Sequence, residues 1–215
     1  MKRALFCLLA VALIASVAQA DTLSGALTAD NQFNAYISTS AGVQGTLITS
    51  GSNWESAFTF SGVSLAPGKT YYLQIEGINW SEWGGVLGRF SLSDSTFQFA
   101  DGTQSLLTSD AANVWNYSAT GFDAAPGQPV SEGANNDTST IWNIIHGTNP
   151  DIDPSAEWIW GYQSTGSDAG ETEYFETTIT PEGSPSPVPE PASLTLLGSG
   201  LLALGGVVAR RRRRA

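Results

Sequence analysis

Short runs in which apolar and polar residues alternate recur from Asp21 to Thr180, and they limit the possible fold more than any other feature of the chain. In one such run, Tyr71, Leu73 and Ile75 share a face of an extended strand, opposite Tyr72, Gln74 and Glu76. Similar runs occupy residues 33–37, 158–162 and 175–179, and turn-forming Gly, Pro, Asn and Asp separate them. No helical period is sustained anywhere in this region. The pattern predicts an all-β domain of about eight to ten short strands, arranged as an antiparallel two-sheet sandwich.

One stretch inside this region lacks the alternation. Residues 120–154 are rich in Gly, Asn, Asp and Pro and contain few apolar positions. We expect them to form one or two long surface loops. Within them the apolar run Ile141–Ile145 is compatible with either a strand or a helix.

The N-terminus has the three parts of a secretory signal peptide. Lys2 and Arg3 provide the positive charge, residues 4–17 form an apolar stretch, and Ala18-Gln19-Ala20 matches an A-x-A cleavage site at Ala18 and Ala20. We therefore expect residues 1–20 to form a signal helix that directs export through the Sec machinery and is then removed. The single cysteine, Cys7, lies in this segment, so the exported domain has neither a disulfide nor thiol chemistry.

Charge limits the partners of the exported part. All twenty Asp and Glu residues lie between residues 21 and 190, together with only two of the nine Lys and Arg residues, Lys69 and Arg89, so the formal charge there is about −18. Binding to nucleic acid depends on clustered Lys and Arg, and this surface has none. Simple solubility, calcium or cationic partners remain compatible with it.

The C-terminal 35 residues have a separate character. Residues 181–191 contain five prolines and predict an extended spacer. Residues 192–209 are apolar and uncharged, and as a helix they would span about 27 Å, enough for a bilayer core. Five arginines follow in a basic tail, residues 210–215, which we expect to stay cytoplasmic and stop transfer: Arg210, Arg211, Arg212, Arg213 and Arg214. The predicted organisation is a signal peptide (1–20), a β-sandwich ectodomain (21–180), a spacer (181–191), a transmembrane helix (192–209) and this tail.

The whole segment from Val188 to Ala215 resembles the PEP-CTERM sorting signal of Gram-negative bacteria. The resemblance rests on Val188-Pro189-Glu190-Pro191, the apolar helix and the terminal arginines, in that order. It implies that an exosortase, a membrane cysteine protease, recognises Pro189, Glu190 and Pro191 and cuts nearby. The precursor would then be held only transiently in the cytoplasmic membrane. The resemblance also implies a destination at the cell surface or in the extracellular matrix, with a link to extracellular polysaccharide and biofilm.

Three segments of the ectodomain look like parts of galactose-binding-like jelly rolls. They are Thr28–Phe33 at a strand entry, Leu65–Tyr71 around a Pro-Gly turn, and the small-residue strand Gly85–Phe90. A late tryptophan, Trp158 or Trp160, completes the likeness. The resemblance implies a jelly-roll form of the two-sheet sandwich.

Two kinds of ligand site are suggested by residue type. Trp80 and Trp83 lie in a predicted loop, where flat rings can stack on sugars, although a tryptophan in a sandwich more often belongs to the core. Asp30 with Asn31, or Asp151 with Asp153, are candidate calcium ligands, since calcium takes oxygen ligands from loops. Asp and Asn also favour turns by bonding their own backbone, which explains both pairs without a metal.

No catalytic constellation stands out. His146 is the only histidine, and no nucleophile-elbow motif or obvious acidic pair accompanies it. We therefore expect a non-enzymatic glycan- or matrix-binding module that needs no cofactor. The alternatives are a glycan-active enzyme on the same sandwich and a purely structural matrix component.

Overall fold

The fold is built from short strands, as the alternating runs predict. The computed structural model describes residues 20–124, 127–162, 166 and 169–182. Backbone contacts group residues 1–180 into one unit and residues 181–215 into another, and the elements below belong to the first, apart from Pro181. The predicted signal helix, transmembrane helix, sorting motif and arginines lie outside the described residues, as does Ala18. None of the helical structure in the described part of the chain has the length and hydropathy that crossing a membrane would need.

The described residues form twelve strands and one short helix. The elements in chain order are β1 (Asp21–Asp30), β2 (Gln32–Ser38), β3 (Thr46–Gly51), β4 (Phe58–Leu65), β5 (Tyr71–Asn79), β6 (Gly85–Leu92), β7 (Phe97–Phe99), β8 (Ser105–Leu107), β9 (Asn116–Ser118), β10 (Val130–Ala134), α1 (Ile141–Ile145), β11 (Glu157–Trp160) and β12 (Glu171–Pro181).

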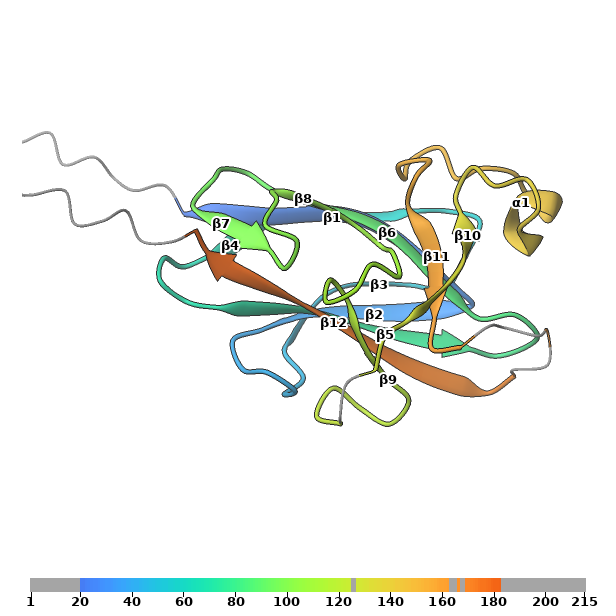
Figure 1. The fold of residues 1–215 in the computed structure, drawn as a ribbon, viewed down its shortest axis with the longest axis horizontal. Coiled ribbons are helices and arrows are strands. Elements are labelled where there is room, and N and C mark those ends of the chain that lie inside the picture. Colours follow the sequence, from blue (N-terminus) through green and yellow to red (C-terminus); the bar gives the residue numbers. More distant parts are fainter. Residues whose placement is uncertain (1–19, 125–126, 163–165, 167–168, 183–215) are drawn as a thin grey trace, which may run out of the picture. The chain divides into compact units, whose positions relative to one another are not determined.

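The strands make two sheets that lie face to face (Figure 1). The first sheet has the order β10-β11-β6-β1-β4, and β8 also pairs with β6. The second sheet has the order β3-β2-β5-β12-β7, and β9 also pairs with β12. The long central pairings, β1 with β6 and β5 with β12, are antiparallel. The prediction of an all-β protein with two antiparallel sheets is confirmed.

The main core lies between the sheets, because the apolar face of each strand turns inward. Leu23 and Leu27 of β1 and Phe90 of β6 belong to the same buried cluster as Leu73 of β5 and Phe175 of β12. Leu23, Leu27, Leu73 and Phe175 have no exposed surface, and Phe90 has 2%. Since the domain contains no cysteine after Cys7, this apolar burial supplies the cohesion that small exported domains often take from disulfides.

A second buried cluster contains the residues on the opposite face of the first sheet. Ala26 of β1 and Leu87 of β6 belong to it, together with Trp158 and, from α1, Trp142. The two indole rings stack with centroids 4.3 Å apart and planes 12° from parallel. Helix α1 begins at the N-cap Thr140, whose side chain accepts a hydrogen bond from the backbone N–H of Asn143.

This cluster corrects the expectation for residues 120–154. They do contain loops, but β10 and α1 also form there, and Trp142 of α1 is buried. The undecided run Ile141–Ile145 is helical. The helix places Trp142 against Trp158, while Ile144 and Ile145 stay exposed.

Candidate functional site

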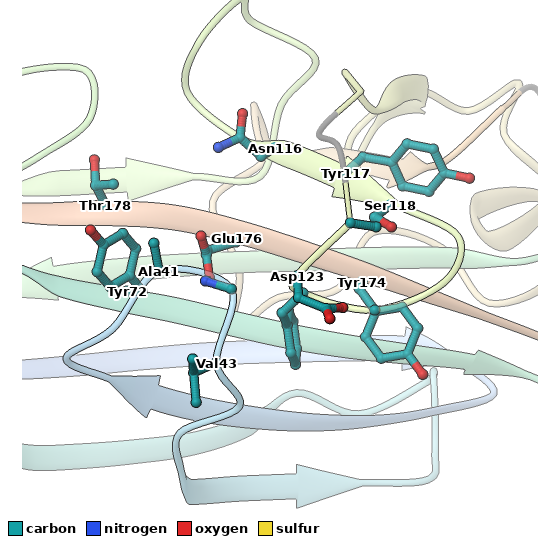
Figure 2. Close-up of a pocket in the computed structure, with 14 residues that line it drawn as sticks. Ala41, Val43, Tyr72, Asn116, Tyr117, Ser118, Asp123, Tyr174, Glu176 and Thr178 are labelled. Atoms are coloured by element: carbon teal, nitrogen blue, oxygen red, sulfur yellow. The ribbon is translucent and has the colours of Figure 1, made fainter.

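A groove of about 450 Å³ lies on the outer face of the second sheet (Figure 2). We call it the sheet groove. Strands β5, β9 and β12 contribute to it, as do the loop between β2 and β3 and the loop that follows β9. Its lining residues are Ala41, Gly42, Val43, Tyr72, Asn116, Tyr117, Ser118, Gly121, Phe122, Asp123, Ala124, Tyr174, Glu176 and Thr178.

Strand register assembles the floor of the sheet groove. Three cross-strand pairs of β5 and β12 lie on one face of the sheet: Tyr72 with Thr178, Gln74 with Glu176, and, at the edge of the groove, Glu76 with Tyr174. The intervening residues of β5 turn the other way, into the core between the sheets. The floor is therefore a polar and aromatic surface on a rigid sheet.

Gln74 fastens the β2–β3 loop over this floor. Its side chain has no exposed surface. Its Oε1 accepts a hydrogen bond from the N–H of Gly45 at 3.0 Å, and its Nε2 donates to the carbonyl of Val43 at 3.1 Å and to Glu176 Oε2 at 2.8 Å. One buried amide thus holds both a loop and a groove carboxylate in place.

Gly42 lets this loop approach the loop after β9. Its φ of +68° lies in the left-handed region that glycine adopts without strain. A Cβ there would lie 3.0 Å from Cα of Asp123, so a larger residue would push the two loops apart. Phe122 fixes the second loop from its own side, since its ring makes edge contacts with Tyr36 and Tyr174.

The charges in the sheet groove are negative. Glu176 and Asp123 line it, and none of the described lining residues is Lys or Arg. Glu176 Oε2 accepts hydrogen bonds from Gln74 and, at 3.3 Å, from the N–H of Gly42. These contacts orient the carboxylate. Figure 2 shows Tyr72, Glu176, Asp123 and Tyr174 along the floor and wall of one hollow.

Beside the sheet groove, Tyr36 and Asn34 secure a further carboxylate. The Tyr36 hydroxyl and the Asn34 amide both donate to Glu76 Oε2, at 3.0 and 2.9 Å. Burial, followed by the hydrogen bond and the charge of Glu76, raises the pKa of Tyr36 to about 12, so the hydroxyl keeps its proton. The pKa of Tyr174 is also raised, chiefly by burial.

These residues were not among the predicted sites, although part of the signal was visible. The alternation in β5 already placed Tyr72, Gln74 and Glu76 on a shared outward face. It did not indicate which loops would rise beside that face, because the two loops come from residues 39–45 and 119–124, far from β5 in sequence.

Three of the predicted site residues, together with the backbone of Trp80, meet at a different place, the end of the sandwich near α1. Asp30, Asn31 and Trp83 line a hollow of about 230 Å³ there, together with Trp54 and Trp142. Trp80 is 56% exposed, and its side chain borders another shallow hollow, beside Phe58. Its backbone N–H is held by Asn31 Oδ1 at 2.6 Å. Trp80 and Trp83 therefore do not share one platform.

The acidic residues proposed for calcium have protein partners. Asp30 Oδ2 accepts a hydrogen bond from Trp142 Nε1 at 2.9 Å, and burial raises the pKa of Asp30 to about 6. Asp153 Oδ1 accepts bonds from the backbone and hydroxyl of Ser155, which lower its pKa. Asp151 is exposed, and its carbonyl accepts a bond from Arg89. Within the described ranges, no group of three or more His, Cys, Asp or Glu side chains is placed to hold a metal ion.

The C-terminal segment provides the match to known proteins. Residues 187–214 match the PEP-CTERM protein-sorting motif. The predicted sorting signal is confirmed by this match, which implies recognition by an exosortase. It supports an exported protein that is processed at the membrane. No curated protein and no solved structure matches the chain.

Proposed function

We propose that this exported, exosortase-sorted protein carries a non-enzymatic glycan-binding module, and that the sheet groove is its binding site. The arrangement of Tyr72 beside Glu176 and Asp123 in a fixed hollow is the observation that supports this most directly. An aromatic ring offers an apolar surface to the C–H face of a sugar. Carboxylates and amides accept and donate the hydrogen bonds that sugar hydroxyls need.

The charge of the sheet groove favours a neutral, hydroxyl-rich polysaccharide. An anionic polymer would place its charges beside Glu176 and Asp123, with no Lys or Arg among the described lining residues to offset them. A neutral chain faces no such cost. The extracellular polysaccharide of a Gram-negative host is the ligand we propose, with the mature protein at the cell surface or in the matrix.

The remaining parts of the proposal concern the form of the fold and the route of the precursor. We propose that the two-sheet sandwich is a jelly roll, that residues 1–20 are removed after Sec export, and that residues 192–209 cross the cytoplasmic membrane until cleavage. The match at residues 187–214 supports this route, because that motif implies export and processing at the membrane.

A glycan-active enzyme is the second candidate, favoured by the presence of two carboxyl groups, Glu176 and Asp123, in one groove. A glycosidase also needs a general acid whose pKa is raised. In the sheet groove, Glu176 Oε2 instead accepts hydrogen bonds from Gln74 and from the N–H of Gly42, so this oxygen is already engaged as an acceptor. This arrangement supports binding over hydrolysis.

The test measures binding of the exported protein, purified from the host, to the extracellular polysaccharide of that host. Replacing Tyr72 with Ala should weaken binding by about tenfold, because the stacking surface is lost. Tyr72→Phe keeps the ring and should retain most of the affinity. Glu176→Gln should have a smaller effect, because Gln preserves the size of the side chain.

Trp80→Ala is the matched control, because it removes an exposed aromatic ring outside the sheet groove. Loss of binding in Trp80→Ala with normal binding in Tyr72→Ala would show that the ligand binds at the loop between β5 and β6 and not in the sheet groove. Release of reducing sugar by the wild-type protein would support the enzyme instead.

A further inference from the structure

The hollow at the end of the sandwich is separate from the sheet groove and shares no lining residue with it. We call it the end pocket. It lies where β1 ends, and the loops containing Trp54 and Trp83 and the helix α1 surround it. Its lining residues are Asp30, Asn31, Trp54, Ser81, Glu82, Trp83, Ile141, Trp142 and Ile145. Its volume of about 230 Å³ suits a small chemical group rather than a polymer.

The deep wall of the end pocket is held rigidly. Trp142 stacks on Trp158, and its Nε1 donates to Asp30 Oδ2 at 2.9 Å. Gly85 of β6 makes room for this indole, since a Cβ at Gly85 would lie 2.7 Å from Trp142 Cζ2. The ring and the carboxylate are thus fixed before any ligand arrives, which lowers the entropic cost of binding.

The loop wall is fixed by Asn31. Its Oδ1 accepts hydrogen bonds from the backbone N–H groups of Trp80, at 2.6 Å, and Ser81, at 3.2 Å. Its Nδ2 donates to Asp30 Oδ1. Glu82 and Trp83 follow directly in this loop, and both line the pocket.

The lining combines three indole rings with two carboxyl groups. No Lys or Arg is among the described residues that line it. Asp30 is 9% exposed, and each of its oxygens already accepts a hydrogen bond. A ligand that needs several new hydrogen bonds is therefore poorly served, whereas a cation without N–H groups gains from the negative field and from the ring faces.

We propose that the end pocket binds a methylated ammonium group, the charged end of a small organic cation. Its methyl groups would pack against Trp54, Trp83 and Trp142, and its charge would lie near Asp30 and Glu82. The exposed side chain of Ile145, 65% accessible, lies at the rim, where it can contact the rest of the ligand. The acidity of the exported region adds a long-range attraction for such a cation.

The test titrates the purified exported protein with choline chloride, followed by calorimetry and by tryptophan fluorescence. The matched ligand is 3,3-dimethylbutan-1-ol, which has the same shape without the charge. We expect choline to bind at least about tenfold more tightly than the alcohol, since cation–π and carboxylate attraction act only on the cation.

Variants assign the site. Trp54→Leu should weaken choline binding by about tenfold, and Asp30→Asn by a similar factor, with the Asn oxygen still able to accept from Trp142. If Asp30→Asn fails to fold, the exposed Glu82→Gln gives the same test, with a loss of a few fold expected. Trp80→Ala, outside the pocket, should change nothing. Equal affinity for choline and the alcohol, no binding of choline, or unchanged binding in Trp54→Leu would overturn the proposal.

Discussion

Burial in the fold raises the pKa of single carboxyl groups, and Glu173 of β12 is the clearest case. Its side chain is 2% exposed, and its Oε2 has no hydrogen-bond partner among the described residues. Burial, opposed by a hydrogen bond from the Tyr117 hydroxyl and reinforced by the charge of Glu171, raises the pKa of Glu173 from 4.5 to about 7. An ionised carboxylate in this place is costly, so the folded state favours the protonated form.

Glu173→Gln should therefore change how stability depends on pH. In the wild type, the pKa raised in the folded state gives stability that is complete below pH 4.5 and is lost as pH rises through about 7. The Gln variant lacks this loss. We expect similar urea midpoints at pH 4.5 and a variant more stable at pH 8 by on the order of 1–2 kcal/mol. Glu182→Gln, at an exposed position, should follow the wild type. Equal stability of Glu173→Gln and wild type at pH 8 would contradict this view of Glu173.

At the scale of elements, the β2–β3 loop depends on Gln74. We expect Gln74→Leu to lower the free energy of unfolding by about 2 kcal/mol, because it leaves the Gly45 N–H and the Val43 carbonyl without this partner. Amide hydrogen exchange at residues 39–45 should also accelerate, and glycan binding in the sheet groove should weaken. Gln44→Leu, at an exposed position of the same loop, is the control. An unchanged rate of hydrogen exchange at the Gly45 amide in Gln74→Leu would show that the loop keeps its conformation without Gln74.

The strands and the helix also show which features of the fold could be predicted from the sequence. The alternation in β5 and β12 predicts which residues turn outward, since the period of a strand is a local property. It fails for β11, where Trp158, Ile159 and Trp160 are all buried, because α1 and its neighbours cover the first sheet from outside. The same covering makes Trp142 a buried residue in a stretch predicted to be surface loop. Contacts between segments distant in sequence decided these cases, and a single sequence does not reveal them.

The sheet groove and the end pocket also differ in how much of them could be predicted from the sequence. Asp30, Asn31 and Trp83 were singled out for different ligands, yet the fold gathers them in the end pocket. Tyr72, Glu176 and Asp123 carried no motif, and strand register together with Gln74 brings them into the sheet groove. Residue type therefore singled out some of the side chains that line the end pocket and none of those in the sheet groove, and strand pairing and loop packing determined which residues lie together.

At the scale of the whole molecule, the two ends of the described domain lie close to each other in the fold. The beginning of β1 and the end of β12 lie at the same end of the sandwich, and α1 lies at the other (Figure 1). The sorting motif at residues 187–214 places the expected cut outside the described domain.

The most direct test of this account is the intact mass of the mature protein recovered from the culture medium or cell surface of the native host. We predict a chain that begins at Asp21 and ends near Pro191, cut at both ends. We also predict that Glu190→Ala is exported but accumulates uncleaved in the membrane, because the change alters Pro189-Glu190-Pro191, the segment that we expect the exosortase to recognise. A mature protein that keeps residues 192–215, or normal release of Glu190→Ala, would contradict sorting by an exosortase.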